Sequence, residues 1–254
     1  MINQLKVLSL CLLIPYTTSA QTSEEKQSIV KIPIELLSGE GLEKLTLEDT
    51  TRTVYQSKVY DGTDLVVYMV AIGTGITNEF DNFPLEEFIF WMNGKAVVEP
   101  AGEPAFEVHT GDYFVQAKGF RGKWNFVDID GVHLELALVA KDRPDSTFRS
   151  PITRAMVIDR DIISGVAVPE NGQIYQGPEL VVNLITDVEE LSKVGHERML
   201  HVLNGVVSLT VPGDPLVYQF FPGDFFVLPK GVVGTWRAAG VQNLRMIEVH
   251  KTKS

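Results

Sequence analysis

Short runs of apolar residues, separated by glycine-containing turns, dominate the hydrophobic pattern of this 254-residue chain. Examples are residues 65–72, 88–92 and 113–116, which are rich in Val, Ile, Phe and Tyr. The runs are short, and the 3.6-residue periodicity of an amphipathic helix is nearly absent. Many short strands at even spacing favour a sandwich or a barrel, so the pattern predicts an all-β protein.

The same pattern occurs twice along the chain. Two blocks of the first half return in the second half, residues 61–67 as 176–182 and residues 111–124 as 223–236. The longer blocks share eight identities in fourteen positions, which indicates two homologous domains. Each copy also contains an Asn-Gly pair, Asn93-Gly94 and Asn204-Gly205. Both residues of such a pair tolerate positive φ, so we expect a hairpin in each copy ahead of its Gly-Asp turn.

The repeat divides the chain into five segments. We expect a signal peptide at 1–20, an arm at 21–59, a first barrel at 60–141, a linker at 142–163 and a second barrel at 164–254. The linker begins with a polar, proline-containing stretch that interrupts strands. The arm is expected to extend along the first barrel.

The first twenty residues have the composition of a secretory signal peptide. Lys6 precedes an apolar run at residues 7–15, and small residues end at Ala20 before a polar stretch. The run has about half of the roughly 20 apolar residues that cross a bilayer, which favours cleavage over a membrane anchor. Bulky Leu10 ahead of Cys11 argues against a lipoprotein signal. The mature protein is therefore expected to be secreted or periplasmic, with no membrane partner.

Charge and cysteine content narrow the function classes further. The chain has 33 acidic and 22 basic residues, a net charge of −11 that opposes binding to phosphate backbones. Its one cysteine, Cys11, lies in the predicted signal peptide. A mature chain without it has no disulfide and no thiol for catalysis or metal binding. We therefore expect neither a nucleic-acid partner nor thiol chemistry.

The repeated blocks resemble the two motifs of the cupin superfamily, G-x5-H-x-H-x3-E-x6-G and G-x5-P-x-G-x2-H-x3-N. The first copy keeps the frame of the first motif through Gly75, Asp81, Phe83, Glu87 and Gly94, and that of the second from Gly111 to Phe126. The second copy matches through Ser192, Val194, Arg198 and Gly205, and then from Gly223 to Ala238. The Gly-x-Trp ending is similar to bicupins such as ureidoglycine aminohydrolase. The resemblance implies two double-stranded β-helix, or jelly-roll, barrels.

The resemblance also implies a metal inside each barrel, held by histidines with a carboxylate or amide. Neither copy has a histidine at a family ligand position, and only Asp81 and Glu87 remain as weak candidate ligands. Lys123 stands where the aminohydrolase branch has a glutamine ligand, and a lysine there would repel a cation. We therefore expect no cofactor, with manganese, iron or zinc as the alternative.

Side chains at the family ligand positions of the first copy remain candidates for chemistry. Asp81, Glu87 and Lys123 are expected to converge inside the barrel, because these family positions point inward. A carboxylate beside a lysine forms either a structural ion network or an acid/base site. Glu87 is also a candidate ligand-binding residue, since a buried charge requires a partner.

Arg198 takes the glutamate position in the second copy. Its guanidinium is suited to gripping the carboxylate of an anionic molecule, and the alternative is a salt bridge to Glu197 or Glu248. Trp124 and Trp236 occupy equivalent positions in the two copies. They form either stacking platforms for a ligand or, more commonly, core anchors.

Histidines do not form an obvious site in this sequence. The five are His109, His133, His196, His201 and His250. His196 and His201 flank the first strand of the second copy's motif, and at that spacing they point to opposite faces. We expect ordinary surface or core histidines rather than a shared site.

The sequence favours an exported bicupin that binds a small polar molecule, anionic or ureide-like, without a transition metal. The first alternative is a ureidoglycine aminohydrolase-like hydrolase or isomerase acting on a small ureide, amino-acid or sugar derivative. The second alternative is a structural dimer with filled barrels. Polar residues in a barrel mouth favour ligand binding or catalysis, whereas an apolar interior favours the structural role. A homodimer is expected from the resemblance alone.

Overall fold

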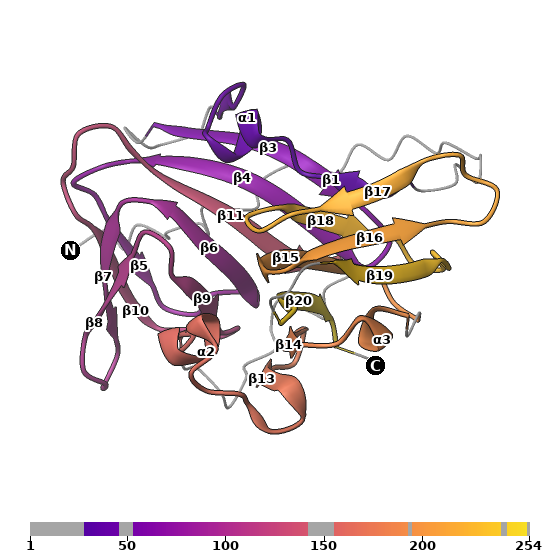
Figure 1. The fold of residues 1–254 in the computed structure, drawn as a ribbon. Helices are drawn as coiled ribbons and strands as arrows, with labels where there is room; N and C mark the ends of the chain where they lie inside the picture. Colours follow the sequence, from indigo (N-terminus) through magenta and orange to yellow (C-terminus); the bar gives the residue numbers. More distant parts are fainter. Residues whose placement is uncertain (1–27, 46–52, 142–154, 193–194, 240–242, 253–254) are drawn as a thin grey trace, which may run out of the picture.

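The computed structural model describes residues 28–45, 53–141, 155–192, 195–239 and 243–252. The predicted signal peptide and most of the predicted linker lie outside these residues. Nearly all elements are antiparallel strands (Figure 1), which confirms the all-β prediction. The short helices are α1 (Ile34–Leu37), α2 (Arg160–Ser164) and α3 (Val188–Leu191), with a 3-10 turn at Glu170–Gly172. None of these described helices has the length and apolar character needed to span a membrane.

Two sheets form the first barrel. The larger contains, in spatial order, β12 (Met156–Val157), β9 (Tyr113–Gln116), β6 (Glu87–Asn93), β11 (Val132–Ala140), β4 (Leu65–Gly73), β3 (Val54–Asp61) and β2 (Glu43–Leu45). The smaller contains β5 (Thr77–Phe80), β10 (Gly122–Phe126), β7 (Lys95–Pro100) and β8 (Phe106–His109).

The second barrel repeats this plan. Its larger sheet contains β1 (Val30–Lys31), β18 (Phe225–Leu228), β15 (Arg198–Asn204), β20 (Arg245–Lys251), β14 (Leu180–Ile185) and β13 (Gln173–Gln176). Its smaller sheet contains β17 (Val217–Phe220), β16 (Val206–Thr210) and β19 (Thr235–Ala239).

Three apolar clusters hold the molecule together, one inside each barrel and one between the barrels. The larger sheets of the two barrels lie against each other (Figure 1), so their strands are covered on both faces. In β4, Leu65 and Val67 face the cluster between the barrels, whereas Val66 and Val70 face the inside of the first barrel. Burial on both faces explains why β4 is an uninterrupted apolar run and not an alternating one.

The Asn-Gly pairs do not connect paired strands. Asn93-Gly94 lies between β6 and β7, and these strands belong to different sheets. The prediction of an Asn-Gly hairpin is therefore wrong, and the same holds for Asn204-Gly205 between β15 and β16. Gly94, at φ +105°, turns the chain from one sheet to the other, where a Cβ would lie 2.0 Å from the His133 ring. The hairpin ahead of the first Gly-Asp turn is instead β7–β8.

Each barrel takes an edge strand from the segment that precedes the other barrel. Strand β1, in the predicted arm, pairs with β18 of the second barrel, with Val30 opposite Val227. Strand β12, in the predicted linker, pairs with β9 of the first barrel, with Met156 opposite Val115. The arm therefore does not extend along the first barrel alone, because its first strand completes the sheet of the second.

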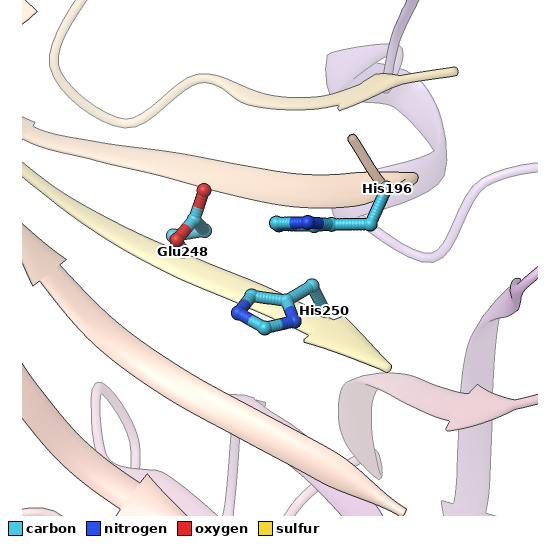
Figure 2. A group of neighbouring side chains, drawn as sticks. All are labelled: His196, Glu248 and His250. Atoms are coloured by element: carbon cyan, nitrogen blue, oxygen red, sulfur yellow. The ribbon is translucent and has the colours of Figure 1, made fainter. Parts of the chain in front are cut away.

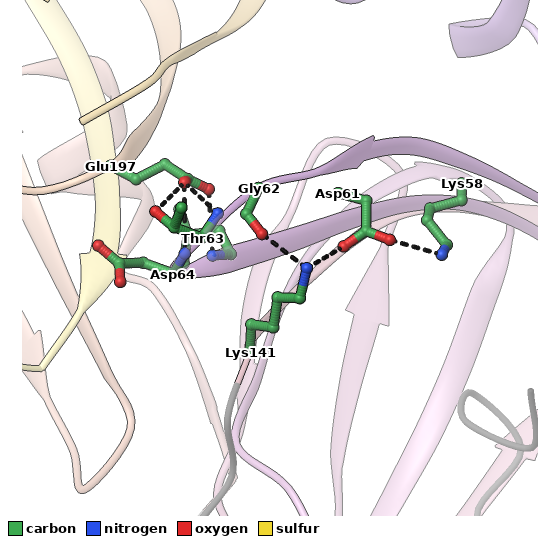
Figure 3. A network of polar contacts seen from close by, with 8 residues as sticks. Lys58, Asp61, Gly62, Thr63, Asp64, Lys141 and Glu197 are labelled. Carbon is green, nitrogen blue, oxygen red and sulfur yellow. Dashed lines mark hydrogen bonds and ion pairs between the residues drawn. The ribbon is translucent and has the colours of Figure 1, made fainter. Parts of the chain in front are cut away.

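A carboxylate from the second barrel is bound by a turn of the first. Glu197, just before β15, is fully buried, and it accepts backbone hydrogen bonds from Thr63 at 2.8 Å and from Leu65 at 3.1 Å (Figure 3). The Thr63 hydroxyl donates a further bond at 3.0 Å. Lys141 holds the same turn, since its ammonium donates to Asp61 and to the Gly62 carbonyl.

The first barrel returns this interaction. Glu86, just before β6, accepts hydrogen bonds from the backbone N–H groups of Glu179 at 2.8 Å and Leu180 at 2.6 Å. Its other oxygen accepts from the Tyr175 hydroxyl. Burial raises the pKa of Glu86, although these hydrogen bonds act in the opposite direction. The two barrels therefore exchange equivalent carboxylates across their interface, each satisfied by the other barrel.

We expect Gly62→Ala to lower the free energy of unfolding by about 1–3 kcal/mol, the usual cost of overpacking. The new Cβ would lie 1.9 Å from Glu197 Oε1 and would push the carboxylate away from its donors. Urea denaturation measures the loss. Gly195→Ala is the matched control, because nothing lies within 4 Å of its Cβ and neither glycine has positive φ. The control should change stability by less than about 0.5 kcal/mol. Equal losses in both variants would contradict this account.

Candidate functional site

Polar side chains gather inside the second barrel, on three adjacent strands. Asn183 of β14 lies opposite Glu248 of β20, and Arg198 of β15 lies opposite His250 of β20. Directly opposed residues of antiparallel strands share a face, and residues two apart on one strand do so as well. Neighbouring residues on the other face, such as Met199 and Val249, lie in the cluster between the barrels. The four polar side chains therefore face the same interior.

A buried ion pair is part of this group of polar side chains. Arg198 Nη1 donates to Glu248 Oε1 at 2.9 Å, and Arg198 Nη2 donates to the Leu191 carbonyl. Asn183 Nδ2 donates to the second oxygen, Glu248 Oε2, at 3.0 Å. Burial alone would raise the pKa of Glu248, but Arg198 and Asn183 outweigh it and lower that pKa. Glu248 is therefore an ionised carboxylate inside the barrel.

Two imidazoles lie beside Glu248. His196, from the segment before β15, and His250 have ring centroids 4.0 Å apart (Figure 2). One ligand atom from each histidine and one oxygen of Glu248 all lie within 4.8 Å of one another. Both histidines are half-buried residues, and the two ring nitrogens of His196 are covered by surrounding atoms.

The first barrel has apolar residues at the same three places. Strand register makes Glu87 equivalent to Arg198, because each lies opposite the matching residue of the last strand, Val139 or His250. By the same register, Ala137 is equivalent to Glu248. His196 precedes Glu197 as Leu85 precedes Glu86. Leu85, Ala137 and Val139 are all buried in the core of the first barrel.

Aromatic side chains fill the first barrel. Trp91, Trp124 and Phe126 contact one another there, and Trp124 is only 4% exposed. Trp236 packs in the core of the second barrel on Phe220 and Phe226. Both tryptophans therefore lie in cores, and neither belongs to the polar group.

Two buried carboxyl groups also lie inside the first barrel. Glu87 and Glu135 are each at most 2% exposed, and Glu135 Oε2 has no hydrogen-bond partner among the described residues. Burial, together with the nearby charge of Glu87, raises the pKa of Glu135 well above its ordinary value. Burial therefore favours the neutral acid form of Glu135.

The predicted convergence of Asp81, Glu87 and Lys123 does not occur. The Asp81 side chain is 94% exposed and lies 3.8 Å from Arg121, whereas Glu87 is buried. Lys123 points outward and pairs with Glu79 at 2.7 Å. The register of β10 explains this, because Trp124 faces the core and its neighbour Lys123 therefore faces solvent.

The residues at the family ligand positions do not fit a metal. In the first barrel these positions hold exposed Asp81, apolar Phe83, buried Glu87 and Gly122. In the second they hold Ser192, Arg198 and Gly234, with Val194 outside the described residues. Neither set brings several nitrogen or oxygen donors to one point, as a transition metal requires.

Sequence reasoning found Arg198 and its alternative partner Glu248, and the salt bridge between them is confirmed. It missed the pairing of His196 with His250, because His250 lies beyond both motifs on the last strand. The sequence signal that could have revealed this pairing is Glu248-x-His250, because residues two apart on a strand share one face and both types bind metals. The opposite orientation of His201 is confirmed, since it stacks on Phe225 between the barrels. Burial lowers the pKa of His201 to about 3, which leaves it neutral.

Comparison with known proteins identifies the fold. A family model described as a EutQ-like cupin domain matches residues 66–129 and 191–240, one segment in each barrel. Each barrel of the chain therefore contains a segment that is similar to a cupin domain. No curated protein sequence matches it.

Solved structures agree with this fold. A protein from Pseudomonas aeruginosa is 14% identical with a TM-score of 0.59, and the match covers 93% of this chain and 92% of that one. A Pseudomonas syringae protein of unknown function is 15% identical with a TM-score of 0.55, covering 87% and 98%. A cupin 2 conserved barrel domain protein from Leptotrichia buccalis is 13% identical with a TM-score of 0.52, covering 82% and 92%. At these identities the similarity concerns the fold alone.

We expect Arg198→Met and Glu248→Leu each to cost about 3–5 kcal/mol of stability, because each leaves a buried charge without its partner. The double variant should cost less than either single change, since it removes both charges together. A double-mutant cycle by urea denaturation measures this coupling. Additive losses would show that the pair contributes nothing beyond its separate side chains.

We expect Glu135→Gln to remove a pH dependence of stability. In the native protein the pKa of Glu135 is raised, so above the ordinary carboxyl pKa the unfolded chain loses a proton that the folded protein keeps. That contribution to stability is complete at low pH and is lost as pH rises toward the folded pKa. The stability difference, variant minus wild type, should therefore grow with pH in parallel denaturation series. A difference independent of pH would contradict the raised pKa.

Proposed function

We propose that this protein is a bicupin whose second barrel binds a small polar molecule, while its first barrel is structural. The observation that carries the proposal is the difference between equivalent positions. Leu85, Ala137 and Val139 occupy these three positions in the first barrel, whereas His196, Glu248 and His250 occupy them in the second. Burial of polar groups costs free energy that an apolar core avoids, so retention of this group favours a ligand role.

The arrangement favours a ligand that both donates and accepts hydrogen bonds. Each oxygen of Glu248 already accepts one bond and keeps a second lone pair for an N–H group. The imidazole of His196 carries an N–H group that can donate to a carbonyl or carboxylate. A ureide with a carboxylate combines these features in one small molecule, which supports the ureide-like class.

Binding of N-carbamoylglycine, with urea and glycine as its fragments, tests the proposal. Calorimetry with wild-type protein should detect binding of N-carbamoylglycine, and His250→Val should weaken it at least tenfold. The change to valine copies the first barrel and removes about one hydrogen-bonded contact, worth about 1.4 kcal/mol or more. His109→Leu is the matched control, because His109 lies at the surface beside Glu107. Its binding should equal that of the wild type.

Failure of all three compounds to bind at millimolar concentration would contradict the ureide-like class. Binding that survives both His250→Val and His196→Leu would place the site outside the second barrel. The first result favours the structural role, with both barrels serving only as a scaffold.

Hydrolysis is the second candidate function. Ionised Glu248 beside two imidazoles offers groups that transfer protons, as a ureidoglycine aminohydrolase-like reaction requires. Incubation of the same probe, followed by nuclear magnetic resonance, separates the two candidates. Turnover that is lost in Glu248→Gln supports the enzyme, and binding without turnover supports the binding module.

Export and homodimerisation are proposed from the sequence and the family resemblance. Cell fractionation of the full chain, compared with a chain lacking residues 1–20, tests export. Light scattering of the mature protein tests the dimer. Retention of the full chain in the cytoplasm, or a monomeric mass, would contradict the respective proposal.

A further inference from the structure

The group of His196, Glu248 and His250 has the composition of a metal site. Two imidazoles with one carboxylate form a common ligand set for divalent first-row metals, among them Zn²⁺, Mn²⁺ and Fe²⁺. Their ligand atoms lie within 4.8 Å of one another, and Figure 2 shows the three side chains beside one another. Donors around a bound metal lie about 3–4.3 Å apart, so small side-chain rotations bring this set to bonding distance.

His250 is already oriented as a ligand. Its Nδ1 lies 2.9 Å from the Lys251 carbonyl, which can only accept, so Nδ1 carries the proton. The lone pair is therefore on Nε2, which points toward the Asn183 amide 3.5 Å away. Metal-binding histidines usually donate their other ring N–H to a carbonyl or carboxylate in this way.

The Asn183 amide lies beside two of these donors. Its Nδ2 lies 3.0 Å from Glu248 Oε2 and 3.5 Å from His250 Nε2, so a single N–H₂ group faces two acceptors. Rotation of the amide by half a turn presents its oxygen instead, which supplies a fourth ligand atom. Arg198 binds the other oxygen, Glu248 Oε1, and leaves Oε2 on the side of the histidine.

These ligands lie outside the family ligand positions of the second barrel. His196 falls between Val194 and Arg198 of the first motif, and Glu248 and His250 lie on β20, beyond the second motif. Within the same chain, the equivalent residues Leu85, Ala137 and Val139 exclude a metal from the first barrel. The same framework thus holds a donor set in one barrel and a filled core in the other.

We propose that His196, Glu248 and His250, with the Asn183 amide oxygen, bind one divalent first-row transition metal in the second barrel. This inference goes beyond the proposed function and does not depend on it. Arg198 acts as a positioning residue, because its ion pair fixes the carboxylate that faces the cation. The ion would leave coordination positions for water or for a small ligand.

Metal content of the mature, untagged protein tests the proposal. The protein is treated with a chelator, equilibrated with Zn²⁺, Mn²⁺ or Fe²⁺ alone, and measured by mass spectrometry and by calorimetric titration. At least one of the three ions should bind with a stoichiometry of about one per chain. His250→Val and His196→Leu, which copy the first barrel, should each weaken that binding at least tenfold.

His109→Leu should bind the metal as the wild type does, since His109 lies on β8 at the surface. Circular dichroism verifies that every variant is folded. Asn183→Asp, which supplies an oxygen donor in either orientation, should retain or strengthen binding. The proposal is overturned if none of the three ions binds stoichiometrically, or if binding persists in both histidine variants. Binding of N-carbamoylglycine by metal-free protein would then still support the proposed function separately.

Discussion

The exchange of Glu86 and Glu197 across the interface is the constraint on which the two-barrel arrangement depends. A buried carboxylate needs several hydrogen-bond donors, and within the described part of the chain each of these two accepts backbone hydrogen bonds from a turn of the other barrel. Gly62 and Gly177 make the approach possible, because a Cβ on either would lie 1.9 Å from the incoming carboxylate. Separation of the barrels would leave both carboxylates without these donors, so neither barrel is complete alone. The exchanged strands β1 and β12 also hold the two barrels together.

The interface contacts lie outside the barrel interiors, so the side chains inside the two barrels can differ. The equivalent turns differ only in detail, since Glu179 of the second barrel also forms a buried pair with Lys118 at 2.5 Å. The interior of the first barrel contains aromatic side chains together with Glu87 and Glu135. The interior of the second contains the Arg198–Glu248 ion pair with two imidazoles beside it. A filled barrel gives a rigid support on which the interior of its partner can hold polar groups. The asymmetry therefore supports the proposal of a structural first barrel and a ligand-binding second barrel.

Sequence reasoning reached the fold because the repeat is local and direct. Eight identities between residues 111–124 and 223–236 fix two equivalent domains before any contact is known. It could not place the exchanged strands, since two-residue strands such as Val30–Lys31 carry no pattern of their own and depend on a distant edge. The hairpin prediction at the Asn-Gly pairs failed for a similar reason. Positive φ at Gly94 is compatible with a corner between two sheets as well as with a hairpin turn. Lys123 was assigned inward from its motif position, although the alternation beside Trp124 turns it outward.

Two residues of the candidate site, Glu248 and His250, could not be found from the family motifs. Family motifs direct attention to Arg198 and the residues near it, yet two donors lie on β20, which no motif includes. What joins them is register: β20 lies between β14 and β15, so Glu248 meets Asn183 on one side and His250 meets Arg198 on the other. Arg198 replaces the family's carboxylate with a cation, and the carboxylate reappears one strand away as Glu248. The pair keeps the charge of the interior balanced, while Glu248 Oε2 faces Asn183 and lies near the imidazoles. The barrel thus has a polar centre without donors at its motif positions, because Glu248 and His250 lie on the neighbouring strand and the ion pair holds the carboxylate in place.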